Sequence, residues 1–218
     1  MDQLTFKFPF SKKYYEQDFF VSTNNFSAFK LIDSWPNWPG KWLNIFGESG
    51  SGKTHLSKIL ERKINKTKLI NANEVNDKTI EDLNDIDCLI VDNYDNNIDS
   101  NIFYSILNQS RQLDNYLLFN SKNSIQSTLF KLEDLRSRIN SFIYIGIELP
   151  TDNLLKVIIT KTLSDRQINV NSKITDYIIN NVERSYEKIF EFLKDLDELS
   201  LSTGKSININ LIKKVINK

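Results

Sequence analysis

The chain has 218 residues, of which 40% are hydrophobic and 26% charged, enough to bury a core in one large domain or in a larger and a smaller one. Its 28 Lys and Arg balance 28 Asp and Glu, which argues against a protein that grips duplex DNA through a basic surface. A single cysteine and a single histidine exclude an internal disulfide, His/Cys metal clusters and histidine-based triads, and the lack of any long apolar run predicts a cytoplasmic protein outside the membrane.

The N-terminal part of the chain mixes extended and helical patterns. In residues 1–13, hydrophobic residues recur at every second position, which indicates an extended strand or an extended peptide ligand. Residues 22–25 are typical of a helix cap and predict a helix directly after them. Residues 35–40 contain two prolines and a glycine, and they predict a turn.

A phosphate-binding loop follows. The pattern G-x-x-x-x-G-K-[ST] is met at every fixed position by Gly47-Glu48-Ser49-Gly50-Ser51-Gly52-Lys53-Thr54. An apolar strand pattern precedes the loop and a helical pattern follows it, which favours a nucleotide site over a Gly/Ser turn. The backbone N–H groups and the helix N-terminus would attract phosphate, Lys53 would reach the terminal phosphates, and the Thr54 hydroxyl would ligate Mg²⁺.

The rest of the chain predicts an α/β domain and then a helical one. Apolar runs predict strands at 42–46, 68–71, 87–92, 116–120 and 142–147. Helical patterns lie at 55–63, 101–111 and 132–139. Five parallel strands with crossover helices make a P-loop α/β domain over 14–150. Beyond Pro150 helices are predicted at 152–165, 172–181, 187–201 and 208–216, which gives a small all-helical domain over 151–218.

One carboxylate ends the predicted strand at 87–92. Asp92 would hold Mg²⁺ together with Thr54, and the alternative is an acid that only caps the strand end. ATPases of the AAA+ type usually carry a second acid at the next position, which polarises the attacking water. Here the next residue is Asn93, which cannot act as a base at neutral pH. We therefore expect nucleotide binding without efficient self-hydrolysis.

An arginine pair precedes the last predicted strand. In Arg136-Ser137-Arg138, a guanidinium could reach the γ-phosphate of a neighbouring subunit and neutralise the charge that develops during hydrolysis. A solvated or salt-bridged surface arginine is the alternative.

Four segments resemble DnaA-type AAA+ proteins, over roughly residues 14–218. Asp18–Asn25 resembles the segment that contacts adenine, and Gly47–Leu56 resembles the nucleotide loop. Leu132–Arg138 resembles the arginine-finger box, and Thr203–Ile209 resembles the segment that closes the helical lid. The resemblance implies a bound ADP or ATP contacted by Phe20, Val21, Asn25 and His55 as well as the loop, with Arg138 acting in trans as the finger.

Three features favour the Hda branch of that family, the regulators of the replication initiator. The chain ends where the helix-turn-helix DNA-binding domain would begin, so direct sequence-specific DNA binding is not expected. The stretch 71–87 is too short for the extra helix with which initiators engage single-stranded DNA, and Asp92-Asn93 resembles the Hda version of the strand end.

The N-terminal tail resembles short peptides that insert into the sliding clamp of bacterial DNA replication. In this interpretation Gln3 gives hydrogen bonds, while Leu4 and Phe6 fill a hydrophobic pocket. An edge strand is the alternative.

The lid arginine that family members place against the phosphates aligns with Lys188, which keeps the charge and loses the planar fork. The whole pattern implies a clamp-associated, nucleotide-bound protein that promotes ATP hydrolysis on the initiator DnaA. A self-hydrolysing motor or loader, a small-molecule kinase and an inactive scaffold are the alternatives, and a homo-oligomer also remains open.

Overall fold

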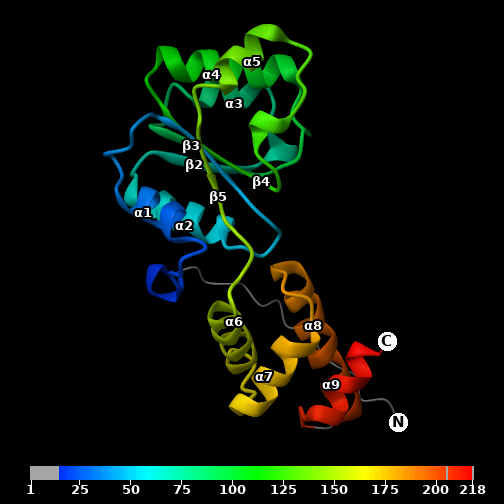
Figure 1. Cartoon of the computed structure of the whole chain (residues 1–218). Helices are drawn as coiled ribbons and strands as arrows, with labels where there is room; N and C mark the ends of the chain where they lie inside the picture. Colours follow the sequence, from blue (N-terminus) through cyan, green and yellow to red (C-terminus); the bar gives the residue numbers. More distant parts are fainter. Residues whose placement is uncertain (1–14, 205, 218) are drawn as a thin grey trace. The chain divides into compact units, whose positions relative to one another are not determined.

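The computed structural model describes residues 15–204 and 206–217. The chain divides into two compact units after Glu148: an α/β unit precedes this boundary, and an all-helical unit begins at Leu149 (Figure 1). Among the described residues, no helix is long and apolar enough to cross a membrane.

The α/β unit is built on a sheet of five parallel strands. They are β1 (Trp42–Phe46), β2 (Thr67–Asn71), β3 (Cys88–Tyr94), β4 (Tyr116–Ser121) and β5 (Ile143–Gly146). In space they follow the order β2-β3-β4-β1-β5, and every neighbouring pair is parallel. Almost every residue of β1, β3 and β4 is buried, as expected for central parallel strands that are covered on both faces.

Helices cover both faces of this sheet. They are α1 (Phe26–Asp33), α2 (Lys53–Lys63), α3 (Asp77–Asp82), α4 (Ser100–Gln112) and α5 (Glu133–Ile139). Figure 1 shows α1 and α2 on one face and α3, α4 and α5 on the other. Since parallel strands need crossover connections, α2, α3, α4 and α5 each carry the chain from the end of one strand back toward the start of the next, whereas α1 precedes β1.

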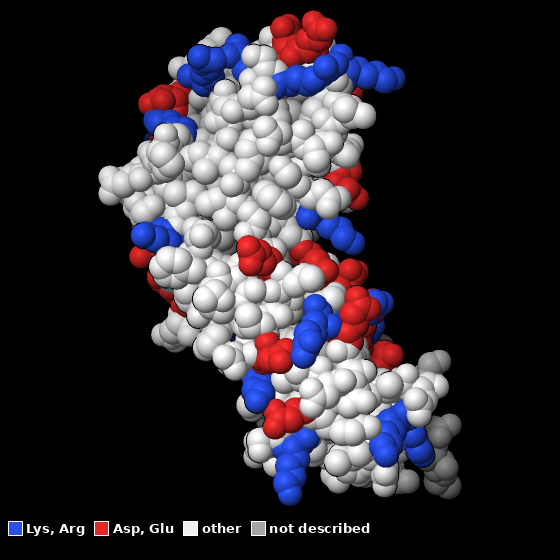
Figure 2. All heavy atoms as spheres, viewed as in Figure 1, with Lys and Arg blue, Asp and Glu red and all other residues white. Residues whose placement is uncertain are grey.

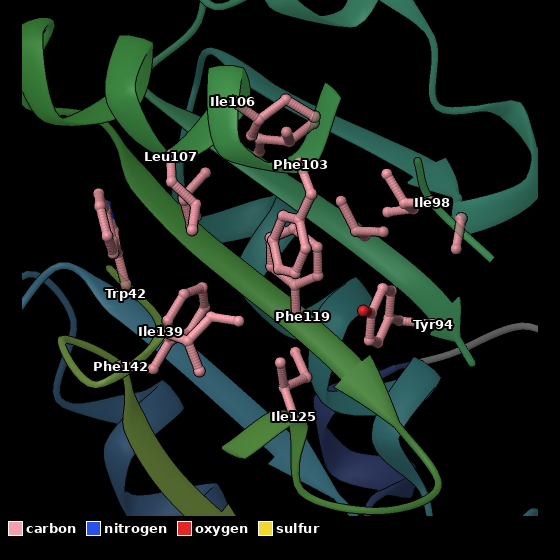
Figure 3. Close-up of a cluster of buried hydrophobic side chains, with 14 of the residues drawn as sticks. Trp42, Tyr94, Ile98, Phe103, Ile106, Leu107, Phe119, Ile125, Ile139 and Phe142 are labelled. Carbon is pink, nitrogen blue, oxygen red and sulfur yellow. The ribbon is translucent and has the colours of Figure 1, made fainter. Parts of the chain in front are cut away.

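Aromatic rings fill the core between the sheet and helices α3, α4 and α5 (Figure 3). Phe103 of α4 and Phe119 of β4 are fully buried, with ring centroids 5.0 Å apart. Tyr94 at the end of β3 and Phe142 before β5 each pack within 6 Å of one of these two rings. The rings thus join β3, β4 and the residue before β5 to α4, and Leu135 and Ile139 of α5 belong to the same core.

The helical unit contains α6 (Asp152–Ser164), α7 (Ser172–Asn181), α8 (Tyr186–Thr203) and α9 (Ile209–Ile216). Each helix begins with a side-chain cap that accepts a hydrogen bond from the backbone N–H three residues later. The capping residues are Thr151, Asn171, Ser185 and Asn208. Four capped helices meet in a separate aliphatic core, whose fully buried members include Leu155, Ile159, Ile189, Leu196 and Ile212.

The predicted fold is confirmed: the chain has a five-stranded parallel sheet and an all-helical C-terminal part. The structure adds helix α3, which the sequence pattern did not predict. Six residues are too few for helical periodicity to emerge, although Asn76 caps this helix in the usual way. The structure also extends β3 beyond Asp92 to Tyr94, through an irregularity in its pairing with β4.

We expect Phe103→Ala to lower the free energy of unfolding of the α/β unit by about 3–5 kcal/mol, because it leaves a cavity among close-packed rings. All three tryptophans, at positions 35, 38 and 42, lie in this unit, so their fluorescence in urea reports its unfolding. The matched control is Leu129→Ala, at a side chain that is 97% exposed, where we expect a change within about 0.5 kcal/mol. Equal losses in the two variants would contradict this view of the core.

Candidate nucleotide site

The phosphate loop lies at the carboxyl end of β1 and leads directly into α2. Two of its glycines have no room for a side chain. A Cβ at Gly47 would lie 2.9 Å from the carbonyl oxygen of Ile147, and one at Gly52 would lie 2.9 Å from the ring of Phe19. Gly52 also has a φ of 98°, in the left-handed region that favours glycine. Gly47 and Gly52, which the motif requires, are therefore required by packing as well.

Lys53 folds back over the loop. Its ammonium group donates hydrogen bonds to the carbonyl oxygens of Gly47 and Glu48, both at 2.7 Å, and lies 3.4 Å from the Ser51 hydroxyl. Burial lowers the pKa of Lys53 from 10.5 to about 8, although the carboxylates of Asp92 and Glu48 act in the opposite direction. Because the Lys53 ammonium group is buried, an anionic group that comes close to it would strongly stabilise its charge.

Asp92 is the centre of a buried polar cluster at the same edge of the sheet. The Thr54 hydroxyl donates to its Oδ2 at 2.8 Å, and the Asn120 amide donates to its Oδ1 at 2.9 Å. The same amide nitrogen also lies 2.7 Å from the Ser57 hydroxyl on α2. Asp92 is only 6% exposed, so these donors offset the cost of burying its charge. Strands β3 and β4 and helix α2 are thereby joined at one carboxylate.

Asn120 and Ser57 were not among the predicted site residues. Asn120 is fully buried, and its side-chain oxygen has no hydrogen-bond partner among the described residues. The sequence does carry a signal for it, because a single amide ends an otherwise apolar strand at 116–120. An amide at the buried end of a strand needs a polar partner, and Asp92 on the adjacent strand supplies it.

Asn93 is exposed and adopts a φ of 59°, in the left-handed region that asparagine tolerates better than most residues. Its backbone N–H donates to Oδ1 of Asp92 at 3.1 Å. The pairing between β3 and β4 shifts its register at this point. The position after Asp92 therefore carries a neutral amide on a bulged strand end and no second carboxylate.

The oxygens of Thr54 and Asp92 suit Mg²⁺. Hydroxyl and carboxylate oxygens are its preferred protein ligands, and Mg²⁺ usually takes only one or two of them besides waters and phosphates. No group of three or more His, Cys, Asp and Glu side chains that could hold a metal exists among residues 15–204 and 206–217. Thr54 and Asp92 could therefore act as ligands of a Mg²⁺ ion that phosphates and waters also hold.

The segment before α1 packs against the start of α2. The ring of Phe19 stacks on Phe29 and makes an edge contact with His55, whose Nε2 lies 2.7 Å from the carbonyl oxygen of Tyr15. Next to this anchored ring, Phe20 and Val21 leave 46% and 36% of their surfaces exposed.

The Asn25 side chain is buried and hydrogen-bonds the backbone of the same segment, at Ser22 and Phe20. Asn25 therefore holds the backbone on both sides of the exposed Phe20–Val21 pair.

Arg138 lies at the opposite edge of the sheet. It is on α5, which ends shortly before the first residue of β5, so it sits near the amino ends of the strands. The phosphate loop and Asp92 follow the carboxyl ends of β1 and β3. Since all strands are parallel, these two places are separated by the length of the sheet. The structure does not bring Arg138 to this chain's own phosphate loop.

The sequence also predicts a role for two other groups of residues. Lys188 is exposed at the start of α8 in the helical unit, and its ammonium group pairs with Glu191 at 2.9 Å. The clamp-binding prediction concerns Gln3, Leu4 and Phe6, which lie outside the described residues.

Comparison with known proteins finds similarity to the replication initiator DnaA and to the Hda lid domain. The family described as "Hda, lid domain" matches residues 153–216. The chain is 23% identical over 248 residues to the chromosomal replication initiator protein DnaA of Buchnera aphidicola subsp. Cinara cedri. That alignment covers 95% of this chain and 53% of the initiator, so the chain spans about half the length of this relative.

Solved structures agree with the fold. Domain III of the Thermotoga maritima initiator DnaA superposes with a TM-score of 0.78 at 17% identity, covering 96% of this chain and 98% of that one. AMPPCP-bound DnaA from Aquifex aeolicus gives a TM-score of 0.68 at 20% identity, covering 89% of this chain and 68% of that one. Together with the parallel sheet, these similarities show that the chain has the AAA+ fold of DnaA domain III and that its helical part is similar to the Hda lid domain.

Proposed function

We propose that this chain is a nucleotide-bound regulator of replication initiation. In this proposal it is held on the DNA sliding clamp and promotes hydrolysis of the ATP carried by the initiator DnaA, which prevents re-initiation. The chain itself binds ADP or ATP with Mg²⁺, and its own nucleotide has a structural role.

One observation carries the proposal: Arg138 and the phosphate loop lie at opposite edges of one parallel sheet. An arginine at the amino edge cannot approach a phosphate bound at the carboxyl edge of the same chain. It is, however, in a position to be offered to a nucleotide held by another protein, and an arginine supplied in trans is a known way to neutralise the charge that develops in phosphoryl transfer.

The binding of adenine nucleotide is supported by the loop itself. Lys53 would exchange its hydrogen bonds to loop carbonyls for bonds to terminal phosphates, and the N-terminus of α2 would add its partial positive charge. Thr54 and Asp92 would hold Mg²⁺, which would neutralise part of the phosphate charge when bound. AMPPCP is the ligand named for the related DnaA structure from Aquifex aeolicus.

The residues at the end of β3 predict that the chain hydrolyses its own nucleotide only weakly. A water molecule that attacks the γ-phosphate needs a group that accepts its proton or orients it, and Asn93 stands at the position after Asp92. Asp92 already accepts hydrogen bonds from Thr54 and Asn120.

A self-hydrolysing ATPase that acts on DNA or on a helicase is the second candidate, because Lys53 of the phosphate loop and the cluster of Thr54, Asp92 and Asn120 would suit such an enzyme equally well. Figure 2 shows acidic and basic side chains interspersed over one face of the chain, without the basic stripe that a DNA track would need on that face. Robust turnover by the isolated protein would favour this candidate.

The pKa of Lys53 predicts how nucleotide binding depends on pH. Since its pKa in the folded chain is about 8, Lys53 loses its proton as the pH rises above 8, whereas bound phosphate favours the protonated form. We expect ADP affinity to fall about fivefold between pH 8 and 9, with uptake of up to about one proton on binding. Calorimetry in two buffers of different ionisation enthalpy measures both quantities.

Lys53→Arg is the control for this experiment. A guanidinium stays charged throughout the range, so the proton uptake should vanish in that variant whatever its affinity. Equal ADP affinity at pH 7.5 and 9 would contradict the prediction that Lys53 contacts the phosphates.

In the absence of ligand, the lowered pKa of Lys53 makes the wild-type fold gain stability as the pH rises from about 8 toward 10.5, because only the unfolded chain then keeps the proton.

Arg138→Ala should abolish stimulation of the initiator. We expect the hydrolysis rate of ATP-loaded DnaA, mixed with clamp on DNA and this variant, to fall to the rate of the initiator alone, since arginines supplied in trans are worth about 10³–10⁵ in rate. The variant should bind ADP as the wild type does, because its own phosphate loop lies at the other edge of the sheet. An undiminished rate would remove Arg138 from the mechanism.

The N-terminal tail gives a separate test. We expect purified clamp to retain the wild-type chain and to lose the double variant Gln3→Ala, Leu4→Ala, since the proposed hydrogen-bonding residue and one apolar anchor are then missing. Lys7→Ala, in the same tail but outside the anchor positions, is the matched control. Equal retention of all three proteins would separate this chain from the clamp.

A further inference from the structure

A second arginine shares a pocket with Arg138. The pocket has a volume of about 420 Å³ and is lined by Asn108, Arg111 and Gln112 of α4 together with Arg138 of α5. Asn108, Arg111 and Gln112 follow at spacings of three and four residues, so they lie on one face of the last two turns of α4. Two separate helices therefore direct guanidinium groups toward one hollow.

The lining of the pocket contains no acidic side chain. Within the part of the chain that the structure describes, neither Arg111 nor Arg138 takes part in an ion pair, whereas other basic residues such as Arg166 and Arg184 do. The C-terminal turns of α4 and α5 each favour a cation through the helix dipole. That effect explains why each helix carries a basic residue. It does not explain why Arg111 and Arg138 line the same pocket without an acidic residue to balance their charge.

Asn108 fixes one side of the Arg138 guanidinium. Its side-chain oxygen accepts a hydrogen bond from Nε of Arg138 at 3.0 Å. The two terminal nitrogens of Arg138 remain as donors, and Arg111 adds the donors of a second planar fork. A compact polyanion with several equivalent oxygens satisfies such a set of donors, and a single carboxylate does not.

We propose that Arg111 is a second phosphate-contacting residue, which acts beside Arg138 on the terminal phosphates of a nucleoside triphosphate held by a partner protein, while Asn108 is a positioning residue for Arg138. The inference rests on the proposed function and deepens it. Two guanidinium groups favour the triphosphate over the diphosphate, because the additional phosphate brings additional charge and acceptor oxygens. Arg111 would thus make the chain recognise the nucleotide state of its partner.

The test compares the affinity of the full chain for initiator DnaA loaded with AMPPCP and with ADP. We expect the wild type to prefer the AMPPCP form and Arg111→Ala to lose about tenfold of this preference, a usual size for the coupling between two bound groups. Arg111→Lys should restore part of it. Arg136→Ala, which removes a guanidinium from α5 outside the pocket, should keep the wild-type ratio.

The effect of Asn108 is measured on the rate. Asn108→Ala should lower the stimulated hydrolysis rate at saturation severalfold and leave the half-saturating initiator concentration unchanged, as expected when only the transition state loses an interaction. Arg111 is exposed, so its variants should fold. Thermal unfolding and ADP affinity equal to those of the wild type check this for every variant.

The outcomes separate this inference from the proposed function. If Arg138→Ala abolishes stimulation but Arg111→Ala keeps the full preference for AMPPCP, the role of Arg111 is wrong and the proposed function stands. If the wild type does not stimulate the initiator at all, both are wrong. A third outcome is that inorganic tripolyphosphate binds the ADP-saturated chain and that Arg111→Ala removes this binding. The ligand of the pocket is then a free polyanion, and the proposal of a nucleotide held by a partner is wrong.

Discussion

The parallel direction of all five strands is the constraint on which the rest of the structure depends. It gathers every strand's carboxyl end at one edge, where the phosphate loop follows β1 and Asp92 ends the regular part of β3. It also places the C-terminal ends of the crossover helices at the other edge, where Arg111 of α4 and Arg138 of α5 lie. A nucleotide site and a cationic pocket thus occupy opposite edges because of topology, and no single chain can bring them together.

At the carboxyl edge, the buried charge of Asp92 depends on donors from two different elements. Thr54 reaches it from α2, and Asn120 reaches it from β4. In a poorly solvated place such bonds are strong, and the loss of one donor leaves the carboxylate undercompensated. The cluster therefore connects the position of the phosphate-loop helix to the positions of two strands. A ligand that displaces the Thr54 hydroxyl would therefore also change the hydrogen bond between Asn120 and Asp92.

Much of this could be predicted from the sequence, because the deciding signals are local. The loop from Gly47 to Thr54 and the apolar strand patterns lie within short windows, and the sheet they predicted is present. The contact between Asn120 and Asp92 joins residues 28 positions apart, and the pocket of Asn108 and Arg138 joins residues 30 apart. Such pairs depend on which strands and helices become neighbours, and helix α3 was missed because six residues show no clear period.

In the proposed function, the arginine pocket at one edge of this sheet would face a phosphate at the opposite edge of a partner's sheet, which implies a head-to-tail contact between two AAA+ units. Two copies of this chain could meet in the same way, and such a heterologous contact does not close on itself after two members. In that case, however, the arginines of one copy would face a strand end that carries Asn93 in the next, where no second acid assists the attack of water. The same contact with a partner that does carry that acid would be productive. The neutral residue after Asp92 and the two arginines at the opposite edge therefore favour, in the proposed function, pairing with a different AAA+ protein over pairing with a second copy.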